Sequence, residues 1–361
     1  MNINRRELLQ ILGASALLSS CGLLNTRPTD LPIESHETIF SGYRVGEAYV
    51  STNAGIHMGS TNQNQRIQLK NEIHSVLYSP KHNVKVFVPK LELYAYAQLG
   101  HGEIFPIEAG KGNYFYGHGA IDEKRNCVYF SQARITESRD DTDRSNIAGF
   151  IYTYSLPDFK FLGQFSSFGN DPHDLKIFND QLLVCNGGQD SRVSVIDLES
   201  KKFVRDYRVR IKHLSLRHID QMDEENFSIA PLTSDSNKPC PLYNLNLKTG
   251  LKPYIISPQL EMALLRFQLL SVLNFGEHVF ATCPMTDSLI VWDRNGKFIG
   301  GAEIPSASNL AISKKLNGVI VGSGFHKEKA RLVKIVNNQI SIEKISWGED
   351  ISGAHSLIVT T

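Results

Sequence analysis

The sequence predicts an all-β fold, a seven-bladed β-propeller closed by N- and C-terminal strands that share one blade. One phrase recurs along the chain: a small polar or His residue, a short apolar strand, a polar turn and a second apolar strand. Successive copies start 38 to 55 residues apart, a spacing that suits one four-stranded blade per copy. The copies start at His74, His118, His173, His218, Ser271, Asn309 and His355.

The copy that starts at His173 shows how the strands of a blade are recognised. Apolar and polar residues alternate in residues 193–197, and turn residues such as Asn179 and Asp180 separate the apolar runs. This pattern favours strands over helices. The four predicted strands, from the inner to the outer, are residues 173–178, 181–186, 192–197 and 203–208.

The last copy supplies only an inner strand, so the rest of its blade is expected from the N-terminal part of the chain. The candidate strands there are residues 43–52, 56–60 and 66–70. Two segments interrupt the repeat. Residues 134–146 are acidic and predict a solvated loop, with a calcium loop as the alternative, whereas residues 260–270 have apolar residues at helical spacing and predict a short helix.

The N-terminus has the pattern of an export signal. Arg5 and Arg6 precede an apolar run, residues 8–18, which is too short to span a bilayer and is typical of a cleavable signal. The paired arginines indicate the twin-arginine route. The sequence Leu-Ser-Ser-Cys ending at Cys21 matches a lipobox, in which Cys21 becomes acylated. A plain secretory signal with an incidental cysteine is the alternative.

These patterns predict three regions: a signal peptide of the lipoprotein type at 1–20, a flexible tether at 21–39 and the propeller at 40–361. Gly22 follows the acylated cysteine, where Asp would indicate retention in the inner membrane. We therefore expect a lipid-anchored protein in the periplasm, at the outer membrane of a Gram-negative bacterium.

Composition excludes several classes of partner and site. Removing residues 1–20 leaves equal numbers of basic and acidic side chains, so no nucleic-acid partner is expected, and membrane contact is expected through the lipid anchor only. Cys127, Cys185 and Cys283 lie in the second strands of three different copies, and Cys240 lies in a loop. No disulfide framework or thiolate metal site is therefore indicated.

The histidines that open five of the copies are the candidate functional residues. If the copies are equivalent, the inner strands bring these side chains together at one mouth of the central channel. Imidazole is a good ligand for iron, copper or zinc, so a transition-metal site is one hypothesis. Asp122, Asp174 and Arg217 are candidate partners that would orient the rings. The candidate metal ligands are His74, His118, His173, His218 and His355.

Other roles for these histidines stay open. In repeat propellers of the WD40 or YVTN type, a Gly-His pair before the inner strand is structural and hydrogen-bonds to an Asp in a turn of the same blade. Gly117 and His118 have this form. Arg217 is expected either to hold an anion or to form an ion pair with Asp220. A catalytic role is a further alternative, although no nucleophile elbow, phosphate-binding Gly loop or His-Glu-x-x-His helix occurs in the sequence.

Three phrases resemble those of the "domain of unknown function 1513" family. They are Tyr-Gly-His-Gly at residues 116–119, Asp-Pro-His-Asp at 171–174 and Leu-Ser-Leu-Arg-His at 214–218, and the resemblance covers roughly residues 40–340. It implies an exported seven-bladed propeller. It also implies imelysin-like or haem-peroxidase-like envelope proteins as partners.

Together, the residues and the resemblance predict a binding module rather than an enzyme, acting in metal, particularly iron, handling through a His-lined channel mouth. The alternative is a scaffold that docks an envelope partner without small-molecule chemistry. A propeller hydrolase is the third hypothesis.

Overall fold

The computed structural model describes an all-β, β-propeller-like fold. The described residues are 37–45, 53–60, 63–69, 72–134, 148–211, 213–235, 237–258, 261, 264–265, 268–323, 330–345 and 355–360. Within them, the only 3₁₀ turns are η1 (Gly188–Asp190) and η2 (Pro284–Thr286). In this part of the chain no helix has the length and apolar character needed to cross a membrane.

Most strands form four-stranded antiparallel sheets in chain order. One sheet contains β12 (Pro172–Phe178), β13 (Gln181–Asn186), β14 (Arg192–Asp197) and β15 (Phe203–Arg208). The next contains β16 (Leu214–Gln221), β17 (Asn226–Thr233), β18 (Tyr243–Asn246) and β19 (Gly250–Pro253). It is followed by β20 (Ser271–Phe275), β21 (His278–Cys283), β22 (Ser288–Asp293) and β23 (Phe298–Glu303). The next sheet contains β24 (Ala307–Ser313), β25 (Gly318–Ser323), β26 (Arg331–Val336) and β27 (Gln339–Lys344).

Two further sheets complete the described fold. The first joins segments from opposite ends of the sequence, in the order β28 (Ser356–Thr360), β1 (Glu37–Val45), β2 (Asn53–Ser60) and β3 (Gln63–Leu69). The second has eight strands: β4 (Ile73–Ser79), β5 (Val84–Glu92), β6 (Tyr94–Leu99), β7 (Ile104–Glu108), β8 (Asn113–Asp122), β9 (Cys127–Arg134), β10 (Ala148–Ser155) and β11 (Phe161–Asn170). Its two halves join where β5 pairs with β8, at Lys90 opposite Tyr116 and Glu92 opposite Phe115.

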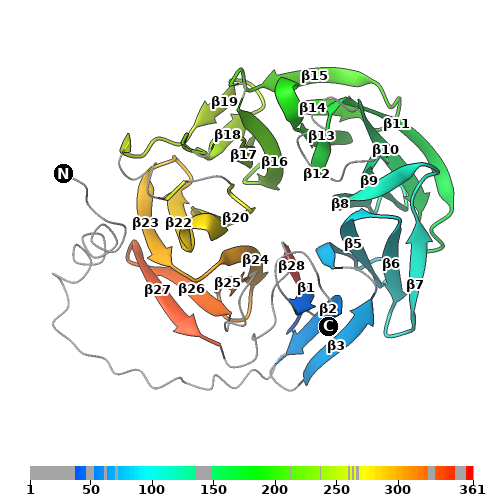
Figure 1. Cartoon of the computed structure of the whole chain (residues 1–361), viewed down its shortest axis with the longest axis horizontal. Helices are drawn as coiled ribbons and strands as arrows, with labels where there is room; N and C mark the ends of the chain where they lie inside the picture. The colour runs from blue at the N-terminus through cyan, green and yellow to red at the C-terminus, as the bar shows by residue number, and fades with distance from the viewer. Residues whose placement is uncertain are drawn as a thin grey trace.

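The sheets stand around a common centre (Figure 1). The first strand of each sheet, such as β12, β16, β20 and β24, lies nearest the centre together with β28, and strands such as β15, β19 and β23 lie at the periphery. The apolar core lies between neighbouring sheets. For example, Cys185 and Val195 of one sheet pack with Leu216, Phe227 and Ile229 of the next. Burial of these faces holds the first strands in place around the centre.

The four cysteines in the described part of the chain are free and buried, as expected for small core residues. Cys127, Cys185 and Cys283 lie on β9, β13 and β21, which belong to three different sheets. The thiol of Cys240 donates to the Pro231 carbonyl at 3.0 Å. Burial accordingly raises the pKa of the Cys185 thiol.

The strand predictions are confirmed most closely in the sheet β12–β15, whose observed strands match the predicted ones to within one residue. The prediction for β1 was wrong. This strand covers Glu37–Val45 rather than residues 43–52, and its first half buries Ile39 and Phe40, which are 1% and 3% exposed. The tether predicted for 21–39 therefore extends too far toward the C-terminus.

Several sequence predictions fall wholly or partly outside the described residues. The signal peptide at 1–20, the lipidation site Cys21 and all of the acidic loop at 134–146 except Arg134 lie there. The helix predicted at 260–270 is described only in part. The Glu261 N–H donates to the Ser257 carbonyl, and the Leu265 N–H to the Glu261 carbonyl, each at 2.9 Å, as in a helical turn.

Candidate metal centre

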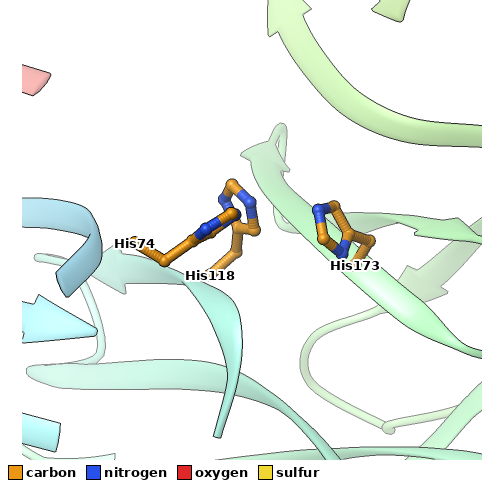
Figure 2. A group of neighbouring side chains, drawn as sticks. All are labelled: His74, His118 and His173. Atoms are coloured by element: carbon orange, nitrogen blue, oxygen red, sulfur yellow. The ribbon is translucent and has the colours of Figure 1, made fainter. Parts of the chain in front are cut away.

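Five imidazoles meet at the centre of the ring of sheets. We call this set the histidine cluster; it consists of His74 on β4, His118 on β8, His173 on β12, His218 on β16 and His355 just before β28. Neighbouring ring centroids in the cluster lie between 4.6 and 6.5 Å apart. Figure 2 shows the rings of His74, His118 and His173 converging on one region. The structure therefore brings together all five histidines that the repeat placed at equivalent positions.

A β-bulge on the inner strand directs several of these rings to the centre. The register with the neighbouring strand shifts between Ile73 and Ser75, between Phe115 and Gly119, and between Pro172 and Leu175. His74, His118 and His173 fall inside these shifts. A bulge bends the strand and changes the direction of a side chain, and bulges are frequent next to active sites. β16 has the same irregularity between Leu216 and His218, which places Arg217 in the bulge.

Gly117 is required at the bulge of β8. Its φ angle is +102°, in the region that favours glycine. A Cβ atom added there would lie 2.6 Å from Cδ2 of His74. The Ser75 hydroxyl donates to the Gly117 carbonyl at 2.6 Å and ties β4 to β8 beside the two rings. The glycine thus permits both the backbone turn and the close approach of His74.

The Nδ1 atoms of three rings have partners outside the cluster. Nδ1 of His118 lies 3.2 Å from Oδ1 of Asp174, and Nδ1 of His355 lies 3.3 Å from the Ser271 hydroxyl. Nδ1 of His173 lies 3.4 Å from Nη1 of Arg217. When a histidine binds a metal ion through one ring nitrogen, a hydrogen-bond partner on the other nitrogen fixes the orientation and tautomer of the ring.

The Nε2 atoms of all five rings, in contrast, are buried and have no hydrogen-bond partner among the described residues. An unsatisfied buried polar atom costs about 1–3 kcal/mol, so five in one place call for an explanation. Two sets of three rings have ligand nitrogens within 4.8 Å of one another: His74, His118 and His173, and His118, His218 and His355.

The surroundings keep four of the five rings neutral, those of His74, His173, His218 and His355, which leaves lone pairs available for a metal ion. Burial, followed by the charge of the neighbouring imidazoles, holds the pKa of His74 and His218 well below its usual value. The pKa of His173 is lowered in the same way. Burial and the nearby His118 lower the pKa of His355 to about 3. Protons therefore do not compete with a metal ion for these nitrogens near neutral pH.

Of the two candidate carboxylate partners, only Asp174 contacts a ring of the cluster, that of His118 on the preceding sheet. Burial raises the pKa of the Asp174 carboxyl, but the neighbouring His118 and its hydrogen bond to Asp174 lower this pKa by more. Asp174 therefore remains ionised. Asp122 does not reach the cluster, which corrects the prediction. It lies at the far end of β8, where the Arg125 amide donates to Oδ1 at 2.9 Å and Nη1 of Arg125 lies 2.9 Å from Oδ2.

Arg217 lies beside the cluster, but the ion pair predicted for it was wrong. Nη2 of Arg217 lies 3.1 Å from Oδ2 of Asp171, and both side chains are almost fully buried. Asp220 instead pairs with Lys176 at 2.8 Å. Sequence reasoning did not select Asp171, although it belongs to the Asp-Pro-His-Asp phrase that also contains His173 and Asp174. The phrase itself was the signal that could have found it.

His118 also differs from the structural histidine of the WD40 type that was the alternative interpretation. Its carboxylate partner, Asp174, lies on the neighbouring sheet rather than in a turn of its own sheet. Asp293, which follows Trp292, accepts from the amides of Asn295 and Lys297 in its own turn, at 2.9 and 2.8 Å. Ser271, which starts the fifth copy of the repeat, contacts His355 as described above.

The fold and the site together define a β-propeller-like protein with a cluster of buried histidines at its centre. The family model described as "Protein of unknown function (DUF1513)" matches residues 67–351. The chain belongs to this family, as the three phrases predicted. A comparison with curated proteins gives no match.

Solved structures support the fold alone. A chain in the structure titled "Crystal Structure of Mitotic Checkpoint Complex" is 10% identical, with a TM-score of 0.59 over 80% of this chain and 86% of that one. A functionally unknown protein from Desulfotomaculum acetoxidans DSM 771 is 11% identical, with a TM-score of 0.58 over 90% of this chain and 99% of that one. At such low identity these likenesses say nothing about activity.

Proposed function

We propose that this protein is a binding module that holds one transition-metal ion in the histidine cluster. The observation that supports this proposal best is the convergence of five buried Nε2 atoms without hydrogen-bond partners among the described residues. Neutral imidazole nitrogen suits zinc, copper and iron, and a bound ion would satisfy several of these atoms at once.

The spacing of the nitrogens fits an ion after a small inward movement of the rings. Ligand nitrogens around a tetrahedral ion lie roughly 3.4 Å apart, because each metal–nitrogen bond is about 2.0–2.1 Å long. In the structure the candidate nitrogens lie within 4.8 Å of one another. Rotation of the side chains on their bulged strands would supply the difference.

We further infer that the sheets form seven blades and that the ring closes through β28. The eight-stranded sheet contains two sets of four consecutive strands, β4–β7 and β8–β11, joined only by the short β5–β8 pairing. Counting these as two blades gives seven with the five four-stranded sheets. The pairing of β28 with β1, from Ser41 opposite Ser356 to Glu37 opposite Thr360, supports closure. In such a ring every inner strand faces one axis.

Metal analysis tests the proposed function. Full-length protein, freed of metal with a chelator, is loaded with Zn²⁺, Cu²⁺ or Fe²⁺, desalted and analysed by inductively coupled plasma mass spectrometry. We expect about one tightly held ion per chain, and loss of it in a His118→Ala/His218→Ala variant. The matched control is His82→Ala/His101→Ala, which removes two histidines outside the cluster. Equal metal content in the two double variants, or none in the wild type, would refute the proposal.

We also propose that the protein works as a lipid-anchored periplasmic protein. The support is the sequence alone: the arginine pair, the apolar run and Cys21. The mass of the N-terminal peptide after expression in a Gram-negative host tests this. An acylated Cys21 at the new N-terminus is expected, and an unprocessed Met1 would contradict it.

A further inference from the structure

The histidine cluster has two chemically different sides, and their hydrogen bonds assign the ring tautomers. A guanidinium only donates, so Nδ1 of His173 must accept from Nη1 of Arg217. A neutral His173 therefore carries its proton on Nε2, the atom that faces the cluster. A carboxylate only accepts, so Nδ1 of His118 carries a proton, and in the neutral ring Nε2 has a free lone pair. His118 is thus prepared to bind a cation, whereas His173 is prepared to donate a hydrogen bond.

The charges around the cluster divide in the same way. The carboxylate of Asp174 lies beside His118, whose ring centroid is 4.8 Å from that of His355. The cations lie on the other side. Arg217 contacts His173, and Nζ of Lys90 lies 5.6 Å from the ring of Tyr116, which is itself 5.7 Å from the His173 ring. A cation is favoured near the Asp174 carboxylate. On the other side Arg217 is paired with Asp171, so Lys90 is the cation that favours an anion there.

The geometry of the two candidate triads agrees with this division. In the triad of His118, His218 and His355, the ring centroids lie 4.6 to 5.2 Å apart. In the triad of His74, His118 and His173, they lie 4.7 to 5.7 Å apart. The first triad is tighter, and neither nitrogen of His218 has a partner among the described residues, so this ring is free to adopt either tautomer.

From these observations we propose that His118, His218 and His355 hold the metal ion and that a small oxyanion completes its coordination on the side of His173, Lys90 and Arg217. The oxyanion would accept a hydrogen bond from the Nε2–H of His173 and lie in the field of Lys90. A carboxylate or a phosphate has this chemistry. This proposal rests on the proposed function, because it requires the ion to be bound.

Co²⁺ provides the test, because its visible absorption spectrum changes when a ligand enters its coordination shell. The full-length protein is loaded with Co²⁺ and titrated separately with acetate and with inorganic phosphate, and sodium perchlorate is used to match the ionic strength. A saturable spectral change with at least one of the two oxyanions is expected, and the two titrations distinguish the carboxylate from the phosphate. Lys90→Gln should weaken anion binding about 10-fold and leave Co²⁺ binding unchanged. Lys252→Gln on the outer strand β19 is the matched control.

A second pair of variants tests the assignment of the ligands. His218→Ala should weaken Co²⁺ binding at least about 100-fold, whereas His74→Ala should weaken it by less than about 10-fold. Normal Co²⁺ binding with a spectrum that neither oxyanion changes would overturn this proposal while leaving the proposed function intact, as would equal effects of the two His variants. Failure to bind Co²⁺, Zn²⁺, Cu²⁺ or Fe²⁺ at all would instead overturn the proposed function itself.

Discussion

Replacing Gly117 by alanine tests the close approach of β8 to His74. Two costs are expected. Alanine at a φ angle of +102° is strained by about 1–3 kcal/mol. The new Cβ atom also meets Cδ2 of His74 at 2.6 Å, and overpacking of this kind costs about 1–3 kcal/mol. The free energy of unfolding should therefore fall by about 2–6 kcal/mol in total.

Two comparisons separate the strain from the clash. Gly112 precedes the same strand, has a φ angle of +77°, and would place an added Cβ atom in open space, with no other atom within 4 Å. Gly112→Ala should therefore cost about 1–2 kcal/mol, from strain alone. In a His74→Ala background the clash partner is gone, so Gly117→Ala should cost about 1–3 kcal/mol less than it does in the wild type.

The assay is urea denaturation of the metal-free protein, followed by circular dichroism and tryptophan fluorescence. Stabilities of the single and double variants give the coupling energy between positions 74 and 117. Strict additivity of the two substitutions, or a Gly117→Ala cost no larger than that of Gly112→Ala, would mean that the His74 ring does not pack on Gly117. The described position of His74 in the cluster would then be wrong.

Three other predictions follow from the surroundings of the cluster. Asp174→Asn should lower Zn²⁺ affinity by about 10- to 100-fold in isothermal titration calorimetry, because it removes the charged acceptor from His118. Asp158→Asn, which changes an exposed carboxylate, is the control. A Zn²⁺ affinity of Asp174→Asn equal to that of the wild type would contradict the role of Asp174. The metal-free protein should lose stability as the pH falls below 6.5, because the cluster histidines with lowered pKa values take up a proton there in the unfolded chain but stay neutral in the folded protein. For His355, with a folded pKa of about 3, the loss of stability at pH 5 is about 2 kcal/mol. A thermal midpoint that does not change between pH 7 and pH 5 would refute this. Arg217→Met should lower the free energy of unfolding by about 3–5 kcal/mol, because it leaves the carboxylate of Asp171 buried and unpaired. Adding Asp171→Asn should recover part of that loss. A double variant less stable than Arg217→Met would count against the ion pair.

Much of the sheet architecture could be predicted from the sequence, because each strand that packs between two neighbours carries a short apolar run bounded by turn residues. Asn179 and Asp180, for example, both have positive φ angles and form the two-residue turn that the sequence predicted between β12 and β13. β1 was harder, because Ile39 and Phe40, the buried apolar residues among those of this strand whose side chains are described, have polar neighbours in the sequence.

The convergence of the histidines was also predictable, since equivalent positions on inner strands meet at the centre. The partners of the rings were not. Which carboxylate meets Arg217 or His118 depends on how far neighbouring sheets are staggered, and this is a property of packing between sheets rather than of local sequence. Residues Asp171 and Asp174 reach different partners although they are three positions apart. The need for glycine at position 117 depends partly on the same packing, because His74 of the neighbouring inner strand comes close there.

The five rings of the histidine cluster come from four different sheets, and the His355 amide donates to the His74 carbonyl at 3.0 Å where the last described strand meets the first inner one. A metal centre on His118, His218 and His355 would need the three sheets that position these residues to be docked together. Occupancy by metal would then report whether these sheets are assembled, and dissociation of the ion would accompany their separation.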